Sequence, residues 1–517
     1  MTEGCDVQSD EQENAFAGPL FLAIDQGGHA SRALVFDRFG EKVVEARRTV
    51  NVQHPQPGWV EQDADALVQS VQSALDEALD KLGKRRRQIV AAGLVTQRSN
   101  IVCWDRNTGR ALSPAISWQD RRAHHWMQTF DGHASTIRRI TGLVPSAHYG
   151  ASKIHWCLEN LTEVKTARAS DNLACGPLAS FLLFRLLKEQ PFVVDAVNAS
   201  RTLLWDKTSR NWSAELLKLF SLDETVLPRC VPNRHEFGGL DIAGQLIPLT
   251  VCSGDQSAAL FSLGMPKVGS AYLNMGTGAF MQCLLEASRQ NEKPPARLLQ
   301  SVVWDDAGHS MQVLEATVNG AGSALSVVEK ELGLSAEQSQ SNYAHWLASA
   351  KNIPLYLNGV SGLGSPFWVP NFNSRFVECN GTPAEPGERI VAVLESILFL
   401  VKVNLEEFST ENVEVKQIVI SGGLSVLDGV CQRLADVSGL QVMRPKQSEA
   451  TAKGLAFLLA SPLLKLSTDK NTLLKRDVMW GEDGAIDHFT PASDSALCER
   501  YRKWQMAIDD ALSEKEK

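Results

Sequence analysis

Two short glycine-containing turns are the segments of this chain best suited to bind phosphate. The first, DQGGHASR at 25–32, separates two β-type runs, and the second, GTG at 276–278, separates two more. Each pattern predicts a tight hairpin whose turn lets backbone N–H groups approach an anion closely. Because the chain has two such turns, we expect two similar domains that bind one polyphosphate.

Asp255 is the residue best placed to act as a general base. The apolar run 249–252 predicts a strand and 257–263 predicts a helix, so Asp255 stands where a strand gives way to a helix. Phosphoryl transfer to an alcohol needs a base for the hydroxyl proton, Mg²⁺ for the phosphates and donors for the developing charge. From the spacing alone, Asp255 could equally well be the N-cap of that helix.

The elements around these residues predict an α/β fold with mixed sheets flanked by helices. After the first hairpin, 42–50 predicts a third strand, 66–82 a helix that Gly83 ends, and 89–95 a buried strand. This order implies a mixed sheet with helices packed on it. In the second half, helices are predicted at 389–408, 450–459 and 494–513, and a strand at 415–420 is followed by a turn at Gly422 and Gly423.

Three parts follow one another along the chain. Residues 1–18 are acidic, with neither a basic start nor an apolar run, so we expect a disordered leader and no secretory signal. Residues 19–264 and 265–517 are the two expected domains, and 264–269 reads as the linker between them.

The composition is typical of an ordinary globular protein and argues against some partners. At 517 residues and 44% hydrophobic content, the chain can form two or three domains. The net charge of −9 argues against nucleic acid or an anionic membrane as partner, and the basic residues at 84–87 are more typical of a solvated loop. No run approaches the roughly 18–20 apolar residues of a membrane span. Ten singly scattered cysteines favour reduced, buried thiols in a cytoplasmic protein.

Twelve segments, in order from about residue 20 to 510, resemble the FGGY carbohydrate kinases, and among them the members that phosphorylate glycerol. No single segment is specific, but the ordered set is. The resemblance implies the two-domain actin-like ATPase (ribonuclease H-like) fold, with the active site in the cleft between the domains, and ATP and Mg²⁺ as cofactors. The segments are AIDQGGHASRALVFD (23–37), PGWVEQD (57–63), TQRSN (96–100), ISWQDRR (116–122), TGLV (141–144), NASRTLLWD (198–206), GDQSAALF (254–261), MGTGAF (275–280), LEATVNGAG (314–322), SGLGSPFW (361–368), SGGLS (421–425) and EATAKGLAFL (449–458).

The resemblance also implies roles for individual residues. Asp255 is then the catalytic base and lies near Mg²⁺ together with Asp25, which acts through water. The first domain is implied to bind the acceptor and the second the nucleotide. The implied acceptor-binding residues are Arg98, Ser99, Trp118, His148, Asp255, Gln256 and Phe280. The implied nucleotide-binding residues are Gly27, Gly28, His29, Arg32, Gly276, Thr277, Gly278, Gly322, Ser326, Gly422, Gly423 and Asp428.

Plainer interpretations of the same residues stay open. Asp25 could be a turn residue that satisfies local N–H groups, and Arg32 a surface arginine. Trp118 and Phe280 could be ordinary core aromatics, because buried aromatic side chains are common.

The chain departs from the family pattern in both binding regions. Where the family has Thr-Thr-Ser, residues 28–30 are Gly, His and Ala, so hydroxyl groups that would contact phosphate are absent. Each lost neutral hydrogen bond costs roughly 0.5–1.5 kcal/mol, which predicts weakened but not abolished ATP binding. The family's acceptor-binding glutamate is Ser99 here, and its pocket tyrosine aligns with His148. These changes predict an altered acceptor preference.

The sequence therefore favours ATP-dependent phosphorylation of a terminal hydroxyl of glycerol or of a related small polyol or sugar. One alternative is a catalytically impaired relative that acts as a nucleotide- or sugar-binding sensor or scaffold. Another is an actin-like ATPase with a protein client. The expected partner is a small-molecule polyol or sugar, and a homo-oligomer (dimer or tetramer) is left open.

Overall fold

The computed structural model describes residues 18–242, 244–290, 292–306, 309–377, 383–446, 449–465 and 486–514. The chain forms two compact units. The first contains the described residues within 1–265, 302–310 and 449–483, and the second those within 266–301, 311–448 and 484–517. The expected leader, 1–18, lies outside the described residues apart from Gly18.

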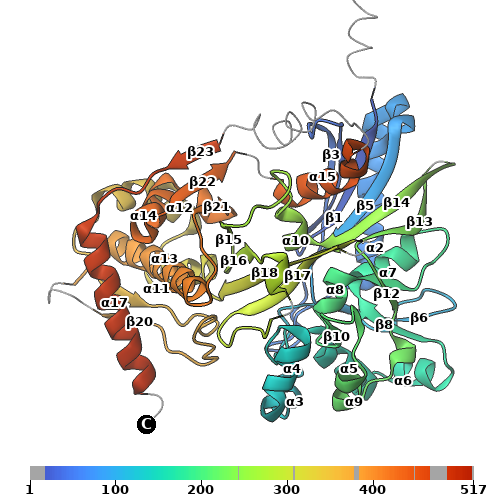
Figure 1. Ribbon diagram of the computed structural model, residues 1–517, viewed down its shortest axis with the longest axis horizontal. Coiled ribbons are helices and arrows are strands. Elements are labelled where there is room, and N and C mark those ends of the chain that lie inside the picture. Colours follow the sequence, from blue (N-terminus) through green and yellow to red (C-terminus); the bar gives the residue numbers. More distant parts are fainter. Residues whose placement is uncertain are drawn as a thin grey trace, which may run out of the picture. The chain divides into compact units, whose positions relative to one another are not determined.

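The first unit is built on a six-stranded mixed sheet with the order β13-β14-β5-β1-β2-β3 (Figure 1). β1 and β2 form the predicted hairpin, and β3 extends it in antiparallel fashion. β5 lies parallel to both β1 and β14, whereas β13 is antiparallel to β14. The strands are β1 (Leu20–Gln26), β2 (Ala30–Phe36), β3 (Lys42–Thr49), β5 (Ile89–Thr96), β13 (Arg234–Ile242) and β14 (Gln245–Gly254).

The second unit's sheet repeats this pattern of strand directions. Its order is β17-β18-β16-β15-β21-β22-β23, with β15 and β16 as the second predicted hairpin. β18 is antiparallel to β16, β21 lies parallel to β15 and to β22, and β23 is antiparallel to β22. The expectation of two similar domains is thus confirmed in topology. The strands are β15 (Ser270–Met275), β16 (Ala279–Leu284), β17 (Leu299–Asp306), β18 (His309–Val318), β21 (Gln417–Ser421), β22 (Gln441–Pro445) and β23 (Ile486–Phe489).

Helices cover the first sheet. α2 (Ala64–Leu82) packs on β2 and β3 through apolar residues at helical spacing, and the side chain of Asp63 caps it by accepting from the amide of Ala66 at 2.9 Å. Gly83 ends it with a positive φ of 59°. α15 (Ala450–Lys465) follows β22 of the second sheet, yet it packs on β1, β5 and the short helix α10 (Asp255–Ala259) of the first unit (Figure 1).

The second unit is centred on helix α13 (Pro386–Thr410), whose middle part, 390–401, is buried throughout. Around it lie α11 (Gly322–Glu331), α12 (Ala336–Ser349), α14 (Asp428–Ser438) and the C-terminal helix α17 (Ser495–Ser513). Glu395 on α13 is buried and pairs with both Arg433 and Arg500, so one carboxylate links α13 to α14 and α17.

Besides the 3₁₀ helices η2 (Asp131–His133), η3 (Glu224–Val226) and η4 (Ala287–Arg289), further short elements complete the described chain. They are β4 (Glu61–Gln62), η1 (Gly83–Gln88), β6 (Ile101–Asp105), β7 (Ala115–Ile116), α3 (His124–Gln128), α4 (Ala134–Thr141), α5 (Gly150–Asn160), α6 (Thr162–Ala169), β8 (Leu173–Pro177), α7 (Leu178–Leu186), β9 (Val193–Asp195), α8 (Ala196–Ser200), β10 (Trp205–Asp206), β11 (Asn211–Trp212), α9 (Ala214–Phe220), β12 (Arg229–Val231), β19 (Leu355–Leu357), β20 (Arg375–Val377) and η5 (Gly423–Val426).

The structure corrects one predicted element near the candidate base. The helix expected at 257–263 is α10, which begins at Asp255 and ends at Ala259, because β14 continues to Gly254 and the turn is immediate. Gly254 is therefore the N-cap, and the alternative of Asp255 as the N-cap is wrong.

The two units are not continuous in sequence. Residues 264–269 lie outside helices and strands, and the first unit gives way to the second after Met265, but 302–310 and α15 belong with the first unit. The domain limits 19–264 and 265–517, and the roles assigned to the two domains, stay predictions. In the described part of the chain, none of the helices combines the length and the apolar character that crossing a membrane requires.

Candidate active site

An ion-pair cluster lies beside the first glycine turn. Asp25 on β1 stands directly opposite Arg32 on β2, and the Nη2 of Arg32 donates to Oδ2 of Asp25 at 2.8 Å. The Nη1 of the same arginine pairs with Glu449, the residue before α15. Arg32 is thus not a plain surface arginine. Sequence reasoning missed Glu449 as a partner, although it opens the segment EATAKGLAFL.

Asp25 is almost fully buried, with 2% of its surface exposed. Burial raises the pKa of its carboxyl to about 6; Arg32 opposes this shift, and the nearby carboxylates of Asp255 and Glu449 add to it. The effect of Asp255 on Asp25 shows that the two predicted metal-side carboxylates lie near each other.

The carboxyl ends of three parallel strands place these groups at one edge of the sheet. β1 ends at Gln26 and β5 at Thr96, which pair with each other, and Gly254 at the end of β14 also pairs with Thr96. Asp255 follows at once, and its Oδ1 accepts from the amide of Gln256 at 2.7 Å. Burial raises the pKa of Asp255, while Arg98 and Arg201 oppose the shift. A buried carboxylate at such an edge can serve as a base.

Arg98 contacts Gln256 and acts electrostatically on Asp255. Its Nη2 donates to Oε1 of Gln256, and its aliphatic part passes over Gly254, where a Cβ would lie 2.5 Å from Cγ of the arginine. Glycine at 254 is therefore needed for this position of the guanidinium. Three of the predicted acceptor-binding residues are brought together here.

Trp118 and His148 form the aromatic part of the same region. Their ring centroids are 5.6 Å apart, and the amide of Trp118 donates to Oδ1 of Asn100 at 2.8 Å. Both side chains are half-buried, and Trp118 lies outside the core of this unit. The interpretation of Trp118 as an ordinary core aromatic is therefore wrong.

The loop that carries His148 is held by a buried lysine. Nζ of Lys153 donates to the carbonyls of Ala147 and His148 at 2.8 and 2.7 Å and to that of Tyr149 at 3.3 Å. Burial lowers the pKa of His148, and the surrounding cations lower it further, so the imidazole is neutral at physiological pH.

Ser99 stands between Arg98 and Asn100 with a left-handed φ of 67°. Within the described structure its buried Oγ has no hydrogen-bond partner. An unsatisfied buried hydroxyl is unusual, and a ligand group would satisfy it.

The first turn is supported mainly by glutamine side chains. The amide of Gly27 donates to the carbonyl of Ala30 at 2.9 Å, and Nε2 of Gln62 donates to the carbonyl of Gly28 at 3.1 Å. His29 at the tip is exposed. Exposure leaves this part of the turn open to a ligand.

The second turn is fastened to the start of α11. The amide of Gly276 donates to the carbonyl of Gly278, the amide of Gly322 to the carbonyl of Gly276, and that of Ala321 to the carbonyl of Thr277, each at 2.9 Å. The predicted residues of this turn and Gly322 therefore lie together.

The remaining predicted nucleotide residues lie in the same unit. Ser326 is exposed on α11, where its hydroxyl donates to the carbonyl of Gly322 at 3.1 Å. Gly422 and Gly423 connect β21 to η5, and a Cβ on Gly422 would lie 2.6 Å from the carbonyl oxygen of Met275. Asp428 is 78% exposed and pairs with Arg444 at 2.8 Å.

Phe280 lies on β16 of the second unit and is half-buried, whereas the other predicted acceptor residues belong to the first unit. The predicted role of Phe280 in binding the acceptor therefore stays a prediction.

The two aspartates fit Mg²⁺, although no cluster of three His, Cys, Asp or Glu side chains suited to a metal occurs among the described residues. Mg²⁺ commonly uses one or two carboxylates and completes its shell with water and phosphate oxygens. Asp25 and Asp255 are both buried with raised pKa values, so a cation would relieve their mutual repulsion.

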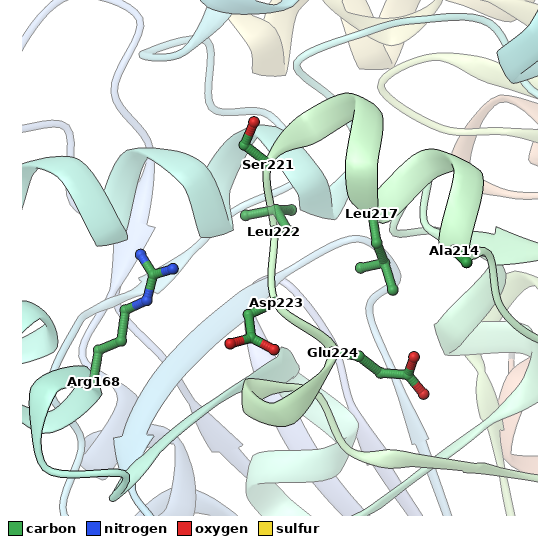
Figure 2. A pocket seen from close by; sticks show the side chains of 7 residues that line it. All are labelled: Arg168, Ala214, Leu217, Ser221, Leu222, Asp223 and Glu224. Atoms are coloured by element: carbon green, nitrogen blue, oxygen red, sulfur yellow. The ribbon is translucent and has the colours of Figure 1, made fainter.

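A separate hollow in the first unit contains none of these residues. Figure 2 shows that it lies between Arg168 of α6, α9, and the loop 221–224 that follows α9. It is open to solvent. Asp223 and Glu224 line it, but no residue of either glycine-containing turn does.

Comparisons with known proteins identify the family of the chain. Residues 20–262 match the N-terminal domain of the FGGY family of carbohydrate kinases, and residues 271–462 match its C-terminal domain. A glycerol kinase of Shewanella amazonensis is 33% identical over 498 residues, covering 95% of this chain and 99% of that protein.

Two solved structures share the fold. Plasmodium falciparum glycerol kinase with ADP has a TM-score of 0.84 at 22% identity, covering 96% of this chain and 98% of that one. Xylulose kinase from Rhodospirillum rubrum has a TM-score of 0.81 at 17% identity, covering 96% and 100%. With two matching domain models and a full-length relative at 33% identity, the chain belongs to the FGGY family of carbohydrate kinases and has its two-domain actin-like ATPase (ribonuclease H-like) fold.

Proposed function

We propose that this kinase transfers the γ-phosphoryl group of ATP to a terminal hydroxyl of glycerol or of a related small polyol or sugar. The observation that carries the proposal is the placement of Asp255 at the carboxyl ends of parallel strands, with Arg98 and Gln256 in contact beside it and Asp25 nearby. The glycerol kinase relatives support the choice of acceptor class.

In the proposed reaction, Asp255 accepts the proton of the acceptor hydroxyl. The hydroxyl oxygen forms a bond to the γ-phosphorus, the bond from that phosphorus to the bridging oxygen breaks, and its electron pair leaves with ADP. Arg98 and Gln256 orient hydroxyl groups, while the faces of Trp118 and His148 contact the carbon chain. When bound, Mg²⁺ held by Asp25 and Asp255, directly or through water, would offset the charge of the phosphates.

The proposal assigns a different role to each unit. The first unit binds the acceptor and provides the base, and Arg32 with the turn at 27–29 contacts phosphate. In the second unit, Gly276, Thr277, Gly278 and Gly322 bind phosphate, while Ser326, Gly422, Gly423 and Asp428 surround the nucleoside. The proposed site of action is the cytoplasm. The cysteines support this location, because all eight in the described part of the chain are free thiols, as is usual in a reducing compartment.

The test is ADP release with a panel of polyols and sugars. One acceptor should stimulate release from the wild type, and Asp255→Asn should lower that rate by about 10²–10⁴-fold, since it removes the base. Because burial raises the pKa of Asp255, kcat/KM should fall as the pH drops through that raised value and the carboxyl becomes protonated.

Nucleotide binding with no turnover on any acceptor would contradict the proposal. That result would favour the sensor or scaffold alternative.

A further inference from the structure

Glu449 is a carboxylate beside the first glycine turn that has no role in the proposed reaction. Nη1 of Arg32 donates to Oε2 of Glu449, and Nη2 of the same arginine donates to Oδ2 of Asp25, so one guanidinium bridges two carboxylates. Glu449 also adds to the raised pKa of Asp25, which shows that its charge acts on that carboxyl. Two acids thus fasten the arginine that is proposed to contact phosphate.

The backbone of Glu449 is fixed by the helix that follows it. Its carbonyl accepts from the amide of Lys453 at 3.0 Å in the first turn of α15. At the next residue, α15 approaches α10 so closely that a Cβ on Gly454 would overlap the carbonyl oxygen of Ala258. Because α10 begins at Asp255, the helix that presents Glu449 packs on the helix that presents the proposed base.

The pair between Arg32 and Glu449 is too exposed to be what holds α15 in place. The two side chains are 28% and 22% exposed, and ion pairs that are open to water contribute little to stability. Apolar side chains of α15 are buried instead, among them Leu455, Leu458 and Leu459. The pair is therefore better explained by its effect on Arg32 than by its effect on the fold.

The two carboxylates restrain Arg32 and still leave it able to bind phosphate. A guanidinium has five N–H groups in a rigid plane, and in the described contacts Asp25 and Glu449 each take one of them. A free arginine side chain has many rotamers, whereas a transition state is stabilised best by donors that are already in place. The same two negative charges also repel the phosphates of ATP.

We infer that Glu449 is a positioning residue, which orients the guanidinium of Arg32 toward the phosphoryl group during transfer and weakens the binding of ATP by its charge. The inference rests on the proposed function and adds a residue to it. Glu449 acts through Arg32 and forms no bond to the reacting atoms. Removal of its charge should therefore have opposite effects on two quantities: ATP binds more tightly because one repulsion is gone, and turnover slows because Arg32 is less restrained.

The first test compares Glu449→Gln, which keeps the size of the side chain and removes its charge, with the wild type. Isothermal titration calorimetry without acceptor should show that the variant binds ATP about three- to tenfold more tightly. Its kcat for acceptor-stimulated ADP release should be at least about tenfold lower. Glu77→Gln is the matched control, because Glu77 pairs with Arg48 on β3 of the same sheet, and it should change neither quantity.

A double-mutant cycle tests whether Glu449 acts through Arg32. Glu449→Gln should lower kcat by less than about twofold when Arg32 has already been replaced by glutamine, because the group that it orients is gone. Equal losses of kcat in the two backgrounds, with each variant shown to be folded by circular dichroism, would overturn the inference. If Arg32→Gln does not fold, the comparison of Glu449→Gln with the wild type decides.

The outcomes separate this inference from the proposed function. An unchanged kcat in Glu449→Gln, or weaker binding of ATP, overturns the inference and leaves the kinase proposal intact, since weaker binding is what a merely structural defect would cause. If no acceptor stimulates ADP release by the wild type, both the inference and the kinase proposal are overturned.

Discussion

The two glycine turns occupy equivalent places in two sheets of the same topology, but different forces hold them. At the second turn, a Cβ on Gly322 would lie 2.9 Å from the carbonyl oxygen of Gly276, and one on Gly278 would lie 3.0 Å from that of Val318. At the first turn, the nearest atoms to a Cβ on Gly27 and Gly28 lie at 3.4 and 3.6 Å, which is ordinary contact.

This difference bears on which residues of the two regions could change. Packing leaves no room for a Cβ at Gly278, against the carbonyls of Val318 and Asn319, or at Gly322 at the start of α11, whereas Gly276 has room for one. The first turn is bordered by the ion pairs of Arg32 and by glutamine side chains, and packing does not demand glycine at residue 28 or histidine at the exposed residue 29. We therefore expect departures from the family pattern at these two residues to affect ligand binding more than folding.

The largest expected effect on stability comes from Gly422→Ala, next to the second turn. Gly422 has a φ of 93°, and a Cβ there would lie 2.6 Å from the carbonyl oxygen of Met275. Strain and overlap together should lower the free energy of unfolding of the second unit by about 2–4 kcal/mol. Hydrogen exchange of residues 270–284 in urea would measure the loss.

Gly28→Ala is the matched control in the first turn, where φ is not left-handed and space is open. It should cost less than about 0.5 kcal/mol. Equal losses for the two variants would break the comparison.

A smaller effect on stability is expected when the charge of Asp25, beside the first turn, is removed. Because burial raises the pKa of Asp25 to about 6, the folded protein binds this proton more tightly than the unfolded chain. The stability that this group contributes is therefore present below about pH 4 and is lost as the pH rises through 6. Asp25→Asn should raise the free energy of unfolding at pH 8 by about 1–2 kcal/mol, after the lost bond to Arg32 is allowed for.

Calorimetry at pH 4 and pH 8 would check this prediction. The gain should become small at pH 4, where Asp25 is protonated in the folded protein and about half protonated in the unfolded chain. A gain of the same size at both pH values would show that ionisation of Asp25 is not its cause.

The smallest expected effect is on the affinity of the first turn for ATP. The double variant Gly28→Thr, His29→Thr restores hydroxyl groups to a turn with room for them, and ATP should bind about 2–10-fold more tightly. Isothermal titration calorimetry measures the affinity, and Gly28→Ala with His29→Ala controls for the loss of glycine. Unchanged affinity, with the fold intact, would mean that the first turn does not contact phosphate.

Local patterns made much of the fold predictable. The hairpins at both turns and the helix α2 follow from runs of neighbouring residues, and the structure has them within a few residues of the predicted limits. The end of β14 was less predictable, because its last residues are small and polar, and α10 therefore begins two residues earlier than expected.

Contacts between distant residues were not predictable in the same way. Arg32 and Glu449 are 417 positions apart, and no periodicity or spacing indicates that they pair. Arg201 belongs to a recognised segment, NASRTLLWD, but only the fold brings it into electrostatic contact with Asp255. The resemblance predicted roles for Asp255, Arg98 and Gln256, but not which distant residues would surround them.

The position of α15 means that the protein cannot be cut in half at its sequence midpoint without damage. A fragment that stops at residue 264 would carry β1 and β5 but would lack the helix that shields them, exposing apolar surface to water. Such a fragment should aggregate when expressed alone. Fusing residues 449–465 to it through a flexible linker should restore solubility, because the strand surface would recover its own cover.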